Sequence, residues 1–144
     1  MERFIDISET PFGKLYGRDC IFLDTAVLKK NDLILEGEIN GTLVKKTVQD
    51  KWIPFRLTFK SVIAYFSCEL DTYENLSRIG GCFGIIEESE HLKKLPVRSD
   101  FDKSEYKHFR VGTFDFVFDI FAKSFEFNTD RGEKPALGKQ RRAL

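Results

Sequence analysis

Apolar and polar residues alternate along much of the chain, most clearly between positions 108 and 128. In this segment apolar residues fall at every second position, namely Phe114, Phe116, Phe118, Ile120 and Ala122. Successive side chains of a β-strand point to opposite sides of the sheet, so a period of two predicts a strand with one apolar side. A helix would scatter the same residues around its circumference. We therefore expect a long aromatic strand and a fold built around a sheet.

The opposite side of this predicted strand is a candidate binding surface. It carries Asp115 and Asp119, and between them the large apolar residues Val117 and Phe121. A strand that is apolar on both sides is either covered by a helix or second layer, or exposed as a contact surface for a partner. Trp52, the only tryptophan, precedes another predicted strand, where it either plugs the core or belongs to a binding site. We take these five residues as candidate binding residues.

A hairpin is predicted over residues 33–48. Asn40-Gly41 separates two alternating segments, and this dipeptide suits a type I′ turn, in which both central residues have positive φ. A two-residue loop there would place Ile39 opposite Thr42. Gly37, inside the first strand, indicates a bulge or a close contact.

The alternation changes phase at two places. Within the segment 53–70, which is one bent strand or two, the apolar series shifts by one residue beyond Ser61. Near Lys123 it shifts again, because Phe125 and Phe127 have the opposite parity from the preceding apolar series. An extra residue in a strand moves the following side chains to the other face. We therefore expect a β-bulge at each of these places.

Shorter segments predict the remaining elements. Residues 4–7 suit an edge strand, residues 15–24 suit a second strand, and the polar run 29–32 suits a turn. Short helices are predicted over 71–81, where Asp71 and Glu74 form a capping box, and over 87–94. Because short connections favour antiparallel neighbours, we predict a mainly antiparallel β-sheet. It is curled into a barrel or folded as a sandwich, with one or two short helices inserted around residues 71–94.

The length of 144 residues suits one domain. We assign residues 1–128 to a single β-rich domain and residues 129–144 to a flexible basic tail, which holds five basic residues and two acidic residues. The 15 phenylalanines are an unusually large number for this length. They either fill a thick sheet core or line a cavity for a small apolar ligand.

Charge and cysteine usage limit the partners and the compartment. The 23 basic and 23 acidic residues balance, so the chain lacks the positive excess that nucleic-acid binding requires. No apolar run approaches the roughly 18 residues of a membrane span, and residues 1–10 do not read as a signal peptide. Cys20, Cys68 and Cys82 show no CxxC spacing and are predicted to be free thiols of a reducing, cytoplasmic compartment.

The chain contains no motif that predicts catalysis, a metal site or a cofactor. Its two histidines, His91 and His108, lack metal-ligand spacing and are expected at the surface or at strand ends. Asp100, Asp102 and Ser104 resemble the start of a calcium loop, but neither the required glycine nor the final glutamate follows. We interpret this segment as a solvated loop.

These observations favour a small cytoplasmic binding protein without catalytic activity, which engages a protein partner through a sheet face or edge. Bacterial immunity and antitoxin proteins offer an analogy for such a function. The alternative is a β-barrel that binds a small apolar ligand in a Phe-lined interior. A third possibility is an enzyme in which Asp71, Tyr73 and Glu74 lie near a cleft.

Overall fold

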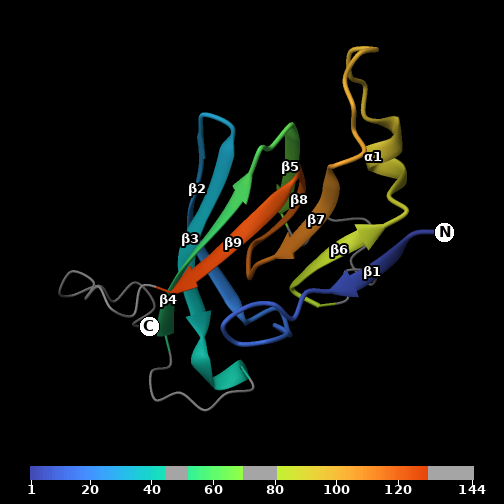
Figure 1. Cartoon of the computed structure of the whole chain (residues 1–144). Helices are drawn as coiled ribbons and strands as arrows, with labels where there is room; N and C mark the ends of the chain where they lie inside the picture. The colour runs from blue at the N-terminus through green and yellow to red at the C-terminus, as the bar shows by residue number, and fades with distance from the viewer. Residues whose placement is uncertain (45–51, 70–80, 130–144) are drawn as a thin grey trace.

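Two antiparallel sheets make up most of the computed structural model, which describes residues 1–44, 52–69 and 81–129 (Figure 1). The first sheet has the strand order β1 (Arg3–Asp6), β6 (Phe83–Glu87), β7 (Lys107–Gly112), β8 (Phe116–Ala122) and β5 (Ala64–Glu69). The second has the order β2 (Ile21–Lys29), β3 (Asp32–Asn40), β4 (Trp52–Lys60) and β9 (Ser124–Thr129). The mainly antiparallel β prediction is confirmed. In the described residues the strands pack as a sandwich and do not close into a barrel.

The two sheets are joined at a corner where two paired strands pass from one sheet to the other. Ser61, with a φ of 58°, lies in the connection between β4 and β5, and Lys123 lies between β8 and β9. The Lys123 N–H donates to the Lys60 carbonyl at 3.0 Å, and the Ile63 N–H donates to the Phe121 carbonyl at 2.9 Å. The two phase shifts in the sequence therefore mark the places where the strands pass between the sheets. Between the pairs Lys60–Ser124 and Ala64–Phe121, residues 61–63 lie opposite residues 122–123, so the expected extra residue is present on the β4–β5 segment. Strands that switch sheets form such corners in sandwiches.

The hairpin predicted around Asn40-Gly41 is not formed. Asn40 has a φ of −77°, and its side-chain oxygen accepts a hydrogen bond from the Thr42 N–H at 3.1 Å. Asn40 therefore caps a short 3₁₀ helix, η1 (Gly41–Leu43), because an asparagine side chain can replace a backbone acceptor there. Strand β3 pairs instead with β4, and Ile39 lies opposite Ile53. The proposed partner segment beyond residue 44 lies outside the described residues.

The hairpin that does form joins β2 to β3. Its turn residues are Lys30, with a φ of 56°, and Asn31, so the predicted turn at residues 29–32 is confirmed. Strand β2 begins only at Ile21, whereas residues 15–20 precede the sheet. Opposite a β-bulge in β2, a Cβ added to Gly37 would lie 2.0 Å from the Phe22 carbonyl oxygen. The close contact predicted at this glycine is therefore present.

The core lies between the sheets and contains a cluster of phenylalanine rings beside many aliphatic side chains. Phe59 contacts Phe83 and Phe109 at centroid distances of 6.1 Å and 5.2 Å, and Phe125 contacts Phe83 at 5.0 Å. Phe127 packs on Phe83 from the end of the second sheet at 6.2 Å. These five phenylalanines thus form part of the core.

Helical structure is limited to short pieces. Helix α1 (Glu90–Lys94) begins after Ser89, whose hydroxyl oxygen accepts a hydrogen bond from the Leu92 N–H at 2.9 Å. It confirms the second predicted helix. The first, over 71–81, falls almost entirely outside the described residues, as do the tail from residue 130 and the residues of the proposed enzyme site. Within the described ranges, no helix has the length and apolar character needed to cross a membrane.

Candidate functional site

The structure separates the five candidate binding residues. Trp52, at the start of β4, is half-buried and packs edge-on against the Phe22 ring at 5.0 Å. Asp115 is exposed in the turn between β7 and β8. Val117, Asp119 and Phe121 lie on the side of β8 that faces away from the core, and only 1%, 9% and 0% of their surfaces are exposed. This side of β8 is therefore covered. A direct role of these three residues in binding stays a prediction.

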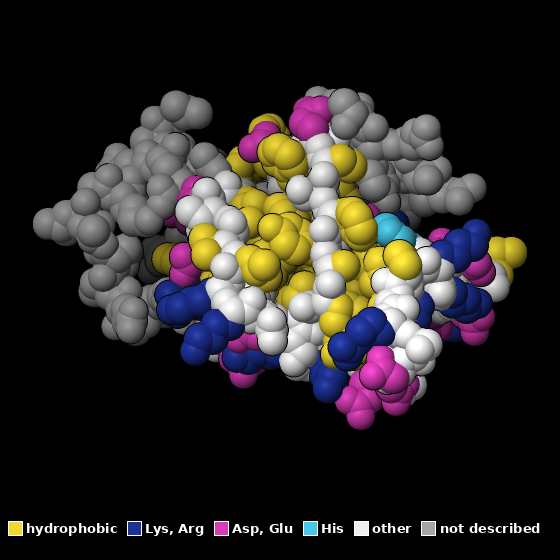
Figure 2. Space-filling model, turned by 90° about the horizontal axis from the view of Figure 1, so that it is seen from above, with side chains coloured by type: hydrophobic (Ala, Val, Ile, Leu, Met, Phe, Trp, Pro, Cys, Tyr) yellow, Lys and Arg dark blue, Asp and Glu magenta, His cyan; other side chains and the backbone are white. Residues whose placement is uncertain are grey.

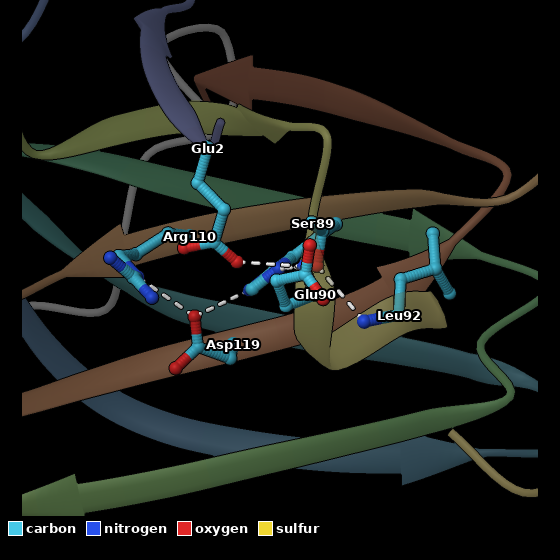
Figure 3. Close-up of polar contacts among 7 residues, drawn as sticks. Glu2, Ser89, Glu90, Leu92, Arg110 and Asp119 are labelled. Carbon is cyan, nitrogen blue, oxygen red and sulfur yellow. Dashed lines mark hydrogen bonds and ion pairs between the residues drawn. The ribbon is translucent and has the colours of Figure 1, made fainter. Parts of the chain in front are cut away.

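Asp119 belongs to a buried row of polar side chains that links β7, β8 and α1 (Figure 3). His108 Nε2 lies 2.6 Å from Asp119 Oδ1, and Arg110 Nε donates to the same oxygen at 2.8 Å. On the other side of the ring, His108 Nδ1 lies 2.7 Å from the Ser89 hydroxyl oxygen. We call Ser89, His108, Asp119 and Arg110 the polar row.

One proton arrangement satisfies every hydrogen bond of the polar row. When Nε2 of His108 carries the hydrogen, it donates to Asp119, and Nδ1 accepts from the Ser89 hydroxyl. The Ser89 oxygen at the same time accepts the Leu92 N–H. The imidazole thus connects the N-terminal cap of α1 to a carboxylate in the sheet.

The charge state of Asp119 follows from its neighbours. Burial raises its pKa, but the hydrogen bond from His108 and the positive charge of Arg110 act in the opposite direction and prevail. The pKa of Asp119 therefore lies below its usual range, and the carboxylate is ionised at neutral pH. His91 of α1 has a lowered pKa, because it is partly desolvated and lies near His108. The row is thus built around one stable negative charge.

Aromatic contacts hold α1 against the same side of the sheet. The His91 ring packs on Phe121 and on Phe66, in each case at a centroid distance of 4.8 Å. At the start of the helix, Glu2 accepts a hydrogen bond from the Glu90 N–H at 2.7 Å. Figure 3 shows Glu2 approaching this N–H beside the polar row. Helix α1 is therefore fixed by both polar and aromatic contacts.

The polar row has the connectivity of a nucleophile, a base and an acid. A serine hydroxyl bonded to an imidazole, which is in turn oriented by a carboxylate, is the arrangement that activates serine for acyl transfer. A pocket of about 580 Å³ opens beside Ser89 and His108, and Ile85, Leu92 and Tyr106 contribute to its lining. The structure thus allows nucleophilic chemistry at Ser89, although the same contacts also explain how α1 is attached.

His108 is the residue of this row that sequence reasoning placed wrongly. It is buried within the sheet, whereas a surface or strand-end position was expected. The available signal was that His108 and Arg110 have the same parity in a predicted strand, so both project from one side. That they meet Asp119 depends on the register between β7 and β8, which the sequence pattern does not specify.

A second candidate site is the free edge formed by the outer half of β2. Strand β2 is buried at Ile21 and becomes exposed along its length, so that every residue from Asp24 to Lys29 is exposed. Val27 and Leu28 in this segment expose 51% and 53% of their surfaces. Among the described strands, β2 pairs only with β3 and therefore leaves one side open. We call residues 24–29 the β2 edge.

The other sheet edges differ from the β2 edge. Strand β1 has four residues, and β9 alternates exposed polar residues with half-buried ones. Strand β5 exposes Tyr65 and Phe66, but Phe66 is already engaged by His91. Figure 2 looks onto the end of the molecule at which the β2–β3 hairpin lies, and shows apolar side chains in the middle with charged side chains around them. The β2 edge is thus the longest exposed edge with unengaged apolar side chains in the described chain.

Comparisons with known proteins do not assign a function to either site. No family model, curated protein or solved structure matches the chain significantly.

Proposed function

We propose that this chain is a cytoplasmic protein-binding protein, which takes up an extended segment of a partner as an added strand on the β2 edge. The observation that carries the proposal is the continuous exposure of this edge strand from Asp24 to Lys29. A strand paired on one side presents a row of backbone donors and acceptors that another chain can use. Natural proteins usually shorten, cover or charge such edges, and the centre of this one is apolar.

The hydrogen-bonding groups available at the β2 edge follow from the hairpin geometry. Lys29 pairs with Asp32 across the two-residue loop. Such closing pairs exchange hydrogen bonds, and bonded and non-bonded pairs then alternate along the strands. Lys29 and Val27 therefore use their backbone groups toward β3. The N–H and C=O groups of Ala26 and Leu28 point away from β3, toward the position of an added strand.

The side chains of the β2 edge suit an apolar strand. Leu28 and Ala26 lie opposite Leu33 and Leu35, which are completely buried, so their side chains share the core side of the sheet. Leu28 nevertheless remains half-exposed. A partner strand with apolar residues at alternate positions would cover it and extend the core.

This proposal keeps the function class that the sequence favours, and it places the contact on an edge. Neutralisation of a partner, as in immunity and antitoxin proteins, remains an analogy. The cysteines at positions 20, 68 and 82 are free, which suits a reducing compartment. Trp52 and Asp115, the more accessible of the predicted binding residues, lie elsewhere on the surface and provide a separate set of positions to test.

The experiment is quantitative affinity capture from the host lysate with wild-type protein and three variants. Ala26→Pro removes an outward N–H and Leu28→Lys charges the exposed edge, whereas Tyr65→Lys makes the same change on β5 as a control. We expect specific proteins that both β2 variants lose and the control retains. Hydrogen exchange of the complex should then show protection within residues 24–29. Equal capture by Leu28→Lys and wild type would overturn the proposal.

A second candidate function, serine-dependent hydrolysis, is favoured by the pocket beside Ser89 and His108. In this reaction the Ser89 oxygen would attack an acyl carbon while its proton passes to His108 Nδ1, which gives it to the leaving group as the acyl bond breaks. Water would then attack the acyl-serine with His108 as base, releasing the acid and restoring the Ser89 hydroxyl. The test is covalent labelling with a fluorophosphonate, read by mass spectrometry. Labelling that is lost in Ser89→Ala and kept in Ser104→Ala, which changes another serine of the pocket, would support it. An unlabelled wild-type protein would exclude it.

A further inference from the structure

The β2 edge is complementary to itself. We infer that, in the absence of a partner, two copies of this chain pair through their β2 edges, antiparallel and about a two-fold axis at Val27. The paired sheet would run continuously from one copy to the other. This inference concerns the same edge as the proposed function and adds its regulation, because a self-paired edge is closed to a partner strand.

Symmetry restricts how two β2 edges can pair. A two-fold axis that relates neighbouring antiparallel strands is perpendicular to the sheet, so it leaves each side chain on its own face. Residues opposite each other in a sheet also share a face. The axis must therefore lie midway between the two copies of one residue, which then face each other. Within the apolar centre of the edge this residue is Ala26, Val27 or Leu28.

The axis at Val27 gives the best match of side chains. It places Ala26 opposite Leu28 of the second copy, and these are the residues whose backbone groups point outward. Each Ala26–Leu28 pair can then exchange both of its hydrogen bonds. The same register places Thr25 opposite Lys29 of the second copy, so the paired segment ends in polar side chains on both sides.

The other two registers match less well. An axis at Ala26 would place Val27 opposite Thr25 of the second copy and would set Leu28 against the bulged part of β2. An axis at Leu28 would place Val27 opposite Lys29 of the second copy, which sets an apolar side chain against a charge, and Ala26 opposite the turn residue Lys30. Only the Val27-centred register sets apolar residues against apolar ones in its centre and polar residues against polar ones at its ends.

Self-pairing would cover the exposed apolar side chains of the β2 edge, which are unusual on a protein surface. Val27 and Leu28 are consecutive and lie on opposite faces, so each face of the edge carries a half-exposed apolar side chain. A second copy would shield both faces at once, because each Val27 meets the other across the axis and each Leu28 meets Ala26. A strand that is long, exposed and apolar is expected to find such a pairing.

The first test is the oligomeric state of the full chain, measured by sedimentation velocity across a range of concentrations. We expect a reversible monomer–dimer equilibrium. Val27→Lys brings two like charges together at the axis and should raise the dissociation constant about tenfold or more. Tyr65→Lys, on the edge of the other sheet, should leave it unchanged. A wild-type protein that stays monomeric at every concentration would overturn the inference.

The second test addresses the register. At the axis, Val27 faces Val27 in a non-hydrogen-bonded pair, whose Cα atoms lie about 4.5 Å apart, within the range of a disulfide. Val27→Cys, oxidised with a thiol-directed disulfide reagent, should form a covalent dimer that dithiothreitol releases. Thr25→Cys should not cross-link to itself, because Thr25 lies opposite Lys29 of the second copy. Equal cross-linking of both variants would contradict the register.

The covalent dimer also separates this inference from the proposed function. If both hold, oxidised Val27→Cys loses the captured partner, and reduction restores it. If the dimer forms but the locked protein still captures the partner, the partner binds elsewhere, and the dimer stands alone. If no dimer forms and Leu28→Lys still loses the partner, the self-pairing is wrong and the proposed function stands.

Discussion

Arg110 lies directly opposite Asp119 in the register of β7 and β8, and its Nε donates to Asp119 Oδ1 at 2.8 Å. The same oxygen lies 2.6 Å from Nε2 of His108, the residue diagonally across the strand pair. One carboxylate oxygen thus joins two cationic or potentially cationic side chains on the side of the sheet that faces away from the core. This relationship makes Asp119 the centre of the polar row.

Removal of Asp119 should strongly destabilise the fold. Asp119→Ala would leave Arg110 and His108 without their shared acceptor, while both side chains remain largely buried. Removing one partner of a buried ion pair lowers the unfolding free energy by about 3–5 kcal/mol, because the other charge stays buried without compensation. Asp115→Ala, a matched change at an exposed position, should stay within about 0.5 kcal/mol of wild type. Urea unfolding of the two variants measures both values, and similar losses would contradict a central role for Asp119.

The contribution of Asp119 should depend on pH in the acidic range. Its pKa is lowered in the folded protein, so the unfolded chain binds this proton first as the pH falls. The stabilisation is therefore complete above an unfolded pKa of about 3.9 and is lost as the pH falls through the lower folded pKa. The difference in unfolding free energy between wild type and Asp119→Asn should shrink from pH 5 to pH 2. A constant difference over this range would show that Asp119 is not stabilised as a carboxylate.

Ser89 should matter for the attachment of α1 whether or not it has a chemical role. Ser89→Ala removes the acceptor for the Leu92 N–H and the donor for His108. Loss of an N-cap costs about 0.5–2 kcal/mol, and hydrogen exchange should become faster in α1 before it changes in β7. Ser104→Ala, whose serine is exposed in a loop, provides the control. Unchanged exchange in α1 would mean that the aromatic contacts of His91 suffice to hold the helix.

The strands could largely be predicted from the sequence, because a half-buried sheet imposes a period of two on each strand. The changes of phase at Ser61 and Lys123 were also visible, but a bulge within one sheet and a bulge at which the strand passes into another sheet produce the same one-residue shift. Which of the two occurs depends on the neighbouring strand. The strand order shows that the sheet changes, because β4 and β9 belong to one sheet and β5 and β8 to the other.

The errors have local physical reasons as well. Asn40-Gly41 has the composition of a hairpin turn, but the Asn40 side chain can also cap a helical turn, and here it bonds to Thr42. The polar row could not be found from spacing alone, because Ser89 and His108 belong to different elements and meet only in the folded chain. The exposure of Val27 and Leu28 likewise depends on what packs against each face of β2 in the folded chain, which alternation within β2 does not reveal.

Ser61 offers a last prediction, in which a substitution should stabilise the protein. Its φ of 58° lies in the left-handed region, which costs a residue with a Cβ about 1–2 kcal/mol. Ser61→Gly relieves this cost and keeps the backbone N–H that bonds to Asp32 Oδ1 at 3.3 Å. Glycine also loses more backbone entropy on folding, so we expect a net gain of about 0.5–1 kcal/mol. Ser67→Gly, an exposed change within β5, should destabilise the protein instead, because its backbone is already extended. The thermal unfolding midpoints of the two variants should therefore shift in opposite directions from that of the wild type. A lower midpoint for Ser61→Gly would show that the serine side chain itself stabilises the corner between the sheets.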